Sequence, residues 1–318
     1  MTNVIEKSIS SLSEYVSLIE QASTREKSDL FRDPHVFFRG QSNKEYQLLP
    51  SLGRYVNQDA LEPLQFTFFE RDLILRAKIE YPTLFTNDLL PFMLIAKMQH
   101  YGIPTRLLDI TSNALVALFF ACSSMDFDGE VIVFQTDNVE LGFDSEINAL
   151  ADTCNIHAGD NDMSYSRFWE IARRQRYYLA RHSINEQIQD DDILRDLPGE
   201  KSARASFRPR FVVPQQLTYR QKNQGSLFIL FPNAPIHWLD TPGIGDKIDP
   251  IEKDSSFVKQ RIIIPKNIKE KLIVDLSMLG IEETQLFPED IDKGCSQIVR
   301  EYRDRLLRTT GECHDCVG

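Results

Sequence analysis

A short apolar strand that ends in an arginine and a glycine constrains the fold of this chain more than any other feature. The run HVFFRGQS covers residues 35–42, and its two phenylalanines predict a strand buried in the core. Arg39 and Gly40 follow, and a glycine allows another part of the backbone to approach closely. A guanidinium binds phosphate or carboxylate through paired hydrogen bonds, so we expect Arg39, Gln41 and Ser42 to bind a ligand. An internal ion pair of Arg39 is the alternative, because arginine is rarely buried without a partner.

A second run with residues typical of a functional site is QHYGIPTRLLD, at residues 99–109. Its glycine and proline break a helix, after which two charged residues, Arg106 and Asp109, interrupt an apolar stretch. We expect Thr105 and Arg106 to line the same anion pocket as the end of the first run, with Asp109 or His100 orienting a substrate hydroxyl. Two alternatives stay open. Arg106 and Asp109 are three residues apart and could pair and cap the adjoining helix, and His100 could be an ordinary core histidine.

Composition narrows the class of protein. The chain has 318 residues and a formal charge of −11, which argues against a broad nucleic-acid surface. Five cysteines are an odd number for a disulfide framework, and Cys122 reads as a core thiol, so we expect a reduced, intracellular protein. Residues 1–9 lack the apolar core of a signal peptide, and the longest apolar run, 114–122, is far shorter than the roughly 20 residues that span a bilayer. These features predict a cytoplasmic protein without a membrane segment.

Strands and helices alternate without a regular βαβ repeat, which predicts an α+β fold: a mixed, mainly antiparallel small sheet surrounded by helices. Apolar patterns predict strands at 36–39, 46–49, 130–135, 211–214, 226–231 and 261–265. They predict helices at 10–22, 60–80, 89–101, 114–123, 215–223, 266–279 and 291–308. We expect an N-terminal helix within 1–30, one domain over 31–310 with a helical insertion at about 137–208, and a tail at 311–318.

Three further regions carry weaker signals. Gln224 precedes a strand and is expected to contact a ligand, whereas Gly225 reads as a turn glycine. The predicted helix at 164–189 mixes arginines with aromatic residues, as single-strand nucleic-acid sites do, although a solvated helix face has the same composition. Cys313 and Cys316 resemble half a zinc site, but no second ligand pair stands at suitable spacing, so we predict no metal.

Several unusual motifs occur in one order along the chain and together carry a family resemblance. They are FFRGQS at 37–42, LLPSLGR at 48–54, QHYGIPTRLLDITSNALVALFFA at 99–121 and RQKNQGSLFILFP at 220–232. The chain resembles the FRG domain family, named for its Phe-Arg-Gly motif, over about residues 35–300. The family is widespread in bacteria and phages and is associated with mobile elements, which implies a role in host–phage conflict.

The aromatic-Arg-Gly strand is also similar to the first strand of arginine-class ADP-ribosyltransferases, in which the arginine holds NAD. This resemblance implies that Arg39 clamps NAD. Those enzymes use a catalytic glutamate near a later strand, whereas residues 221–226 here contain no acid. Asp109, Gln224 and His100 are therefore the candidate catalytic residues.

Two functional hypotheses follow. In the first, a polar pocket with Arg39 binds a nucleotide-like ligand such as NAD, and cleaves it or transfers a group from it. In the second, the chain is a non-enzymatic interaction module, the same residues form a structural polar network, and the helix at 164–189 recognises a protein or nucleic-acid partner.

Overall fold

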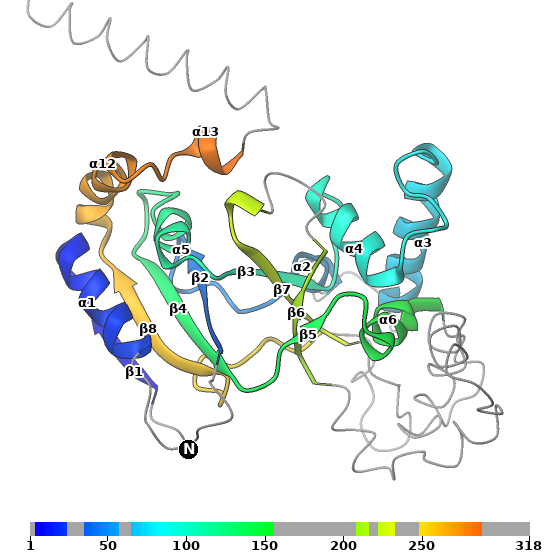
Figure 1. Ribbon diagram of the computed structural model, residues 1–318, viewed down its shortest axis with the longest axis horizontal. Coiled ribbons are helices and arrows are strands. Elements are labelled where there is room, and N and C mark those ends of the chain that lie inside the picture. The colour runs from blue at the N-terminus through cyan, green and yellow to red at the C-terminus, as the bar shows by residue number, and fades with distance from the viewer. Residues whose placement is uncertain are drawn as a thin grey trace, which may run out of the picture.

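The computed structural model describes residues 4–23, 35–56, 65–155, 208–215, 222–232 and 248–287 (Figure 1). Several expectations fall outside these ranges. They are the helices at 164–189 and 291–308, most of the helix at 215–223, most of the insertion at 137–208, and the tail with Cys313 and Cys316. Within the described ranges, no helix is both long enough and apolar enough to cross a membrane.

The described residues form one sheet of eight strands, in the order β1-β8-β4-β2-β3-β7-β6-β5. Only the β1–β8 and β5–β6 pairs among these strands are parallel, so the sheet is mixed and mainly antiparallel, and the predicted α+β class is confirmed. The strands are β1 (Ile5–Ser8), β2 (His35–Gln41), β3 (Leu107–Thr111), β4 (Gly129–Thr136), β5 (Glu140–Leu141), β6 (Arg210–Val213), β7 (Ser226–Leu230) and β8 (Val258–Ile264).

Two groups of helices pack against separate halves of this sheet (Figure 1). The group nearer β1 consists of α1 (Leu12–Ser23), α5 (Ala114–Ala121) and α12 (Lys269–Met278), which follows the short 3-10 turn η3 (Lys266–Ile268). The group nearer β5 consists of α3 (Gln65–Glu80), α4 (Pro91–His100) and α6 (Ser145–Ala151), followed by the 3-10 turn η1 (Asp152–Asn155). Two further short helices are α2 (Ser51–Val56) and α13 (Glu283–Leu286).

Local sequence explains where the key helices begin. Pro91 occupies the first turn of α4, where its missing N–H costs nothing. The Asn113 side chain accepts hydrogen bonds from the Leu115 and Val116 amides and so caps α5. The near-continuous apolarity of α5 matches its position, since the helix lies directly against β2 and β4 and most of its side chains reach a core.

Strands β2 and β3 are neighbours in the sheet but are held together at a single position. Phe38 pairs with Thr111, whereas β2 pairs with β4 along its whole length and β3 pairs fully with β7. The sheet therefore opens between β2 and β3 from Arg39 onward, at the line that separates the two groups of helices.

The structure corrects three expectations about the elements. A strand at 46–49 is reduced to one bridge, between Leu48 and Ile251, and Leu48 and Leu49 are buried in a core cluster with side chains of β2, β3 and β4. Strand β3 was not expected, since Gly102 and Pro104 precede it and a charged residue interrupts it. The N-terminal segment contains β1 as well as the helix, and β1 pairs in parallel with β8.

Candidate functional site

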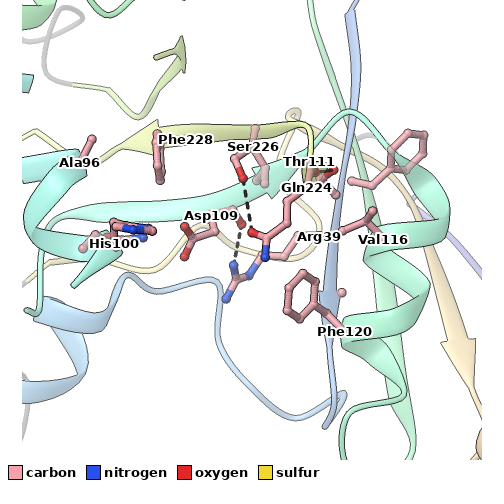
Figure 2. Close-up of a pocket in the computed structure, with 14 residues that line it drawn as sticks. Arg39, Ala96, His100, Asp109, Thr111, Val116, Phe120, Gln224, Ser226 and Phe228 are labelled. Carbon is pink, nitrogen blue, oxygen red and sulfur yellow. Dashed lines mark hydrogen bonds between the residues drawn. The ribbon is translucent and has the colours of Figure 1, made fainter. Parts of the chain in front are cut away.

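Arg39 reaches from β2 across the opening toward β3 (Figure 2). Its Nη1 donates a 2.6 Å hydrogen bond to the backbone carbonyl of Asp109, where a strand pair would otherwise continue. Its buried Nε has no hydrogen-bond partner among the described residues. Burial lowers the pKa of Arg39 to about 10, while the Asp109 carboxylate acts to raise this pKa. The guanidinium is thus charged at neutral pH and incompletely satisfied.

A cavity of about 260 Å³ lies at this opening, between α4 and α5, and we call it the Arg39 cavity. It brings together four of the residues proposed from the sequence: Arg39, His100, Asp109 and Gln224. Phe120 and Phe228 supply apolar walls from α5 and β7 (Figure 2). A small apolar-walled space with a few convergent polar groups is the usual form of a ligand site.

Asp109 has an unusual place for an acid, at the centre of an interior strand. Its neighbours Leu108 and Ile110 are buried, but the Asp109 side chain is exposed to the cavity. The carboxylate makes no hydrogen bond or ion pair with any described residue. His100 lies on the last turn of α4, where its ring packs edge to face against Tyr101 with centroids 5.0 Å apart. The acid and the imidazole thus face the same small space.

Gln224 is held at the cavity by contacts on both sides. Its backbone carbonyl accepts a 2.6 Å hydrogen bond from the Thr111 hydroxyl, and its Nε2 donates to the Leu286 carbonyl at 3.0 Å. Gly225 has a φ of 55°, the left-handed region that favours glycine, which agrees with its expected role in a turn. One N–H of the amide is engaged, so Gln224 can offer a ligand its second N–H and its Oε1, which also accepts from Ser226 at 3.5 Å.

Gly40 serves packing and not chemistry. A Cβ at this position would lie 1.8 Å from the Ala117 carbonyl oxygen of α5, well inside the contact distance. The close approach predicted from the sequence is therefore that of a helix backbone, which this glycine brings against β2. In the Phe-Arg-Gly motif, the phenylalanine at 38 fills the core, the arginine enters the cavity and the glycine admits α5.

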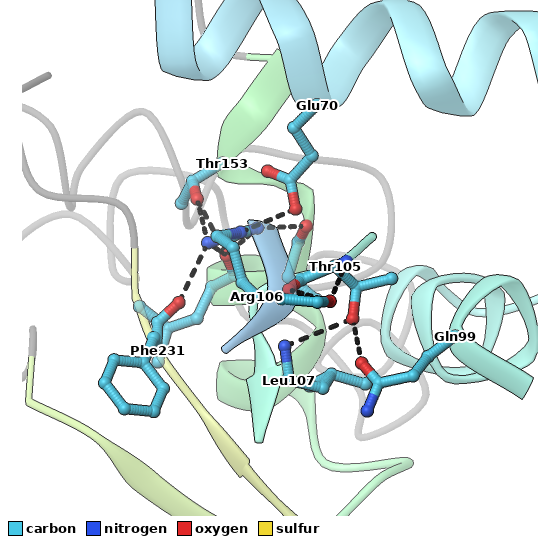
Figure 3. A network of polar contacts seen from close by, with 10 residues as sticks. Glu70, Gln99, Thr105, Arg106, Leu107, Thr153 and Phe231 are labelled. Carbon is cyan, nitrogen blue, oxygen red and sulfur yellow. Dashed lines mark hydrogen bonds and ion pairs between the residues drawn. The ribbon is translucent and has the colours of Figure 1, made fainter. Parts of the chain in front are cut away.

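The structure corrects the expectation that Arg106 shares a pocket with Arg39. Arg106 is fully buried and its Nε forms a 2.7 Å ion pair with Glu70 of α3, not with Asp109 (Figure 3). Its two other nitrogens donate to Thr153 and to the carbonyls of Leu150, Ala151 and Phe231. Burial raises the pKa of Glu70, and the charge of Arg106 opposes that rise. No donor nitrogen of Arg106 remains for a ligand.

Thr105 is also buried in this network and does not line the Arg39 cavity (Figure 3). Its hydroxyl donates to the Gln99 side chain and accepts from the Leu107 amide at 3.2 Å. Gln99 does line the cavity, so Thr105 acts on the site only through this neighbour.

Gln41 and Ser42 line a second cavity of about 540 Å³, which shares Arg39, Gly40 and Phe120 with the first. The Gln41 side chain is 4% exposed, and its Oε1 has no hydrogen-bond partner among the described residues. Arg54, which lines this cavity too, was not singled out from the sequence. Its signal was available, since Arg54 ends one of the family motifs.

Comparison with known proteins gives one family. Residues 34–129 match the family model of the FRG domain, a range that contains β2, β3, Arg39 and Asp109. Neither a curated protein nor a solved structure matches the chain.

Proposed function

This chain is an FRG-domain protein, and we propose that its Arg39 cavity binds an anionic, nucleotide-like ligand, with NAD as the candidate. The proposal rests on Arg39, whose charged guanidinium has a buried Nε without a hydrogen-bond partner among the described residues. A buried donor left unsatisfied costs about 1–3 kcal/mol. A phosphate oxygen that accepts from Nε would remove that cost and neutralise the charge of the guanidinium. No described residue accepts a hydrogen bond from Nε.

The other lining groups suit the rest of such a ligand. Phe120 and Phe228 offer faces on which a planar base can pack, and Asp109 and the Gln224 Oε1 accept hydrogen bonds from ribose hydroxyls. The cavity alone is slightly below the roughly 300–1,000 Å³ of common ligand sites, and the adjoining cavity beyond Gly40 supplies the additional space.

The same geometry supports an NAD-consuming reaction. When the bond between nicotinamide and ribose breaks, its electron pair leaves with nicotinamide and positive charge develops on the ribose. The Asp109 carboxylate, free of an ion pair among the described residues, would stabilise that charge and so take the role that a glutamate has in ADP-ribosyltransferases. A water molecule or another acceptor then adds to the ribose and loses its proton to Asp109 or His100.

Calorimetric titration with NAD tests the binding. We expect saturable binding to the wild-type protein and a loss of at least tenfold in affinity for Arg39→Met. Arg76→Met, a matched change at an exposed position of α3, should bind as the wild type does. The absence of wild-type binding at millimolar NAD would contradict the proposal.

Nicotinamide release tests the reaction separately. Asp109→Asn keeps the shape of the side chain and removes its charge, so we expect it to retain NAD binding and to lose nicotinamide release by at least tenfold. Binding without release by the wild type would leave a nucleotide receptor and remove the enzymatic step. The setting of host–phage conflict is proposed from the family resemblance alone.

A further inference from the structure

The charged side chains that line the second cavity, among the residues that the structure describes, are all positive. The side chains that line it include two arginines, Arg39 and Arg54, together with the polar groups of Gln41, Ser42, Tyr46 and Ser123. None of the described residues that line it is an aspartate or a glutamate, although the chain as a whole carries a charge of −11. We call this space the basic cavity.

The two guanidiniums of the basic cavity lie close enough to repel each other. Burial lowers the pKa of Arg39, the Asp109 carboxylate acts to raise it, and the charge of Arg54 acts to lower it further. Arg39, Arg54 and Asp109 together line a third, smaller cavity of about 180 Å³. Arg54 Nη1 donates to the Leu49 carbonyl at 2.9 Å, and its remaining nitrogens have no partner among the described residues. Two neighbouring cations with unused donors are the arrangement that a phosphate group satisfies.

Gln41 adds an orphan acceptor to these donors. Its Nε2 donates to the Gln47 carbonyl at 3.2 Å, which fixes the amide so that Oε1 is the atom left over. That buried oxygen has no donor among the described residues. A hydroxyl or N–H of a ligand is the natural donor, since an unpaired buried acceptor is costly.

We infer that the basic cavity binds the phosphate of a phosphorylated sugar, with Arg39 and Arg54 on the phosphate and Gln41 Oε1 accepting from a sugar hydroxyl. The inference rests on the proposed function and deepens it, because it places the sugar phosphate of the nucleotide beyond Gly40. The base then lies in the Arg39 cavity, between its two aromatic walls.

Titration of the full chain with ribose, ribose 5-phosphate, pyrophosphate and NAD tests this placement. We expect ribose 5-phosphate to bind at least tenfold more tightly than ribose. Arg54→Met should lower the affinity for ribose 5-phosphate, pyrophosphate and NAD by at least tenfold. The affinities of Arg54→Lys should lie between those of Arg54→Met and the wild type. Gln41→Leu should lower the affinity for ribose 5-phosphate but leave the affinity for pyrophosphate unchanged.

Controls separate binding from folding. The thermal midpoint of each variant is measured alongside, and Arg76→Met should bind all four probes as the wild type does. Equal affinity of the wild type for ribose and ribose 5-phosphate would overturn the inference, as would an Arg54→Met protein that binds NAD normally. A Gln41→Leu protein with wild-type affinity for ribose 5-phosphate would overturn the contact between Gln41 and a sugar hydroxyl. Wild-type NAD binding that Arg39→Met weakens would keep the proposed function in place under any of these results, whereas the absence of wild-type NAD binding would remove the proposed function and this inference together.

Discussion

Arg39 and Arg106 lie in two regions of similar sequence character, yet the structure uses them in opposite ways. Each arginine accompanies an apolar strand, and a sequence pattern cannot tell them apart. Arg106 is fully enclosed, paired with Glu70, and donates from every nitrogen to the surrounding elements. Arg39 is partly enclosed, donates once to a backbone carbonyl, and has a buried Nε that no described residue pairs with. A buried cation whose donors are all satisfied thus holds the fold together, whereas one with an unsatisfied donor is available to a ligand.

Substitution of Arg106 should reduce the stability of the protein more than any other change considered below. Arg106→Met leaves Glu70 buried without its cation, so we expect a loss of about 3–5 kcal/mol in the free energy of unfolding. Urea denaturation followed by circular dichroism measures this. Arg106→Met combined with Glu70→Leu should recover part of the loss, because no unpaired charge then remains. A single variant as stable as the wild type would remove the contrast between the two arginines.

Gly40→Ala should cause the next largest loss of stability, because this cavity-lining glycine is also needed for the packing of α5 on β2. In Gly40→Ala the new methyl group meets the Ala117 carbonyl, so α5 must shift away from β2. We expect a destabilisation of about 1–3 kcal/mol or more in the same denaturation experiment. Gly102→Ala is a contrasting control, since a Cβ there meets open space and only its φ of 82° opposes the change. A Gly40→Ala protein of wild-type stability would contradict the close helix contact.

Arg39 should give a small effect on stability and a large one on binding. Arg39→Met removes a buried, incompletely paired charge, so we expect its free energy of unfolding to stay within about 1 kcal/mol of the wild type. Its NAD affinity should nevertheless fall at least tenfold. A loss of stability similar to that of Arg106→Met would make Arg39 structural and favour the interaction-module hypothesis.

The smallest effect is a pH dependence with opposite signs for binding and stability. The pKa of Arg39 is lowered to about 10, so its charge, and with it the affinity for an anion, should be constant from pH 7 to 9 and fall as pH rises through 10. Since the folded state disfavours this charge, the contribution of Arg39 to stability should rise over the same range. Comparing wild type with Arg39→Met at each pH isolates both trends from other titrating groups. Parallel profiles for the two proteins would contradict them.

The fold was predictable where apolar runs are continuous. Residues 36–39 and 130–135 were expected as strands and lie within β2 and β4. Strand β1 has four exposed residues and so has no apolar pattern to detect. Strand β3 was missed because its exposed Asp109 interrupts the apolar run.

Part of the site was also predictable, because polar residues at breaks in apolar runs are visible in the sequence. Arg39, His100, Asp109 and Gln224 were proposed from breaks in buried elements, and they line one cavity. Arg106 was misplaced because its ion-pair partner, Glu70, lies 36 residues earlier on a different helix. Local sequence shows that a charge is present in an apolar stretch, but only the tertiary fold shows whether a distant residue neutralises it.

The single pairing between β2 and β3 has a mechanical consequence. The sheet consists of two four-stranded halves, each with its own helices, and one pair of residues joins their backbones across the centre. Ladder hydrogen bonds give a sheet its stiffness, so this line is where the sheet bends most easily. A ligand held by Arg39 on one half and by Asp109 on the other would act as a crosslink between them and stiffen the sheet.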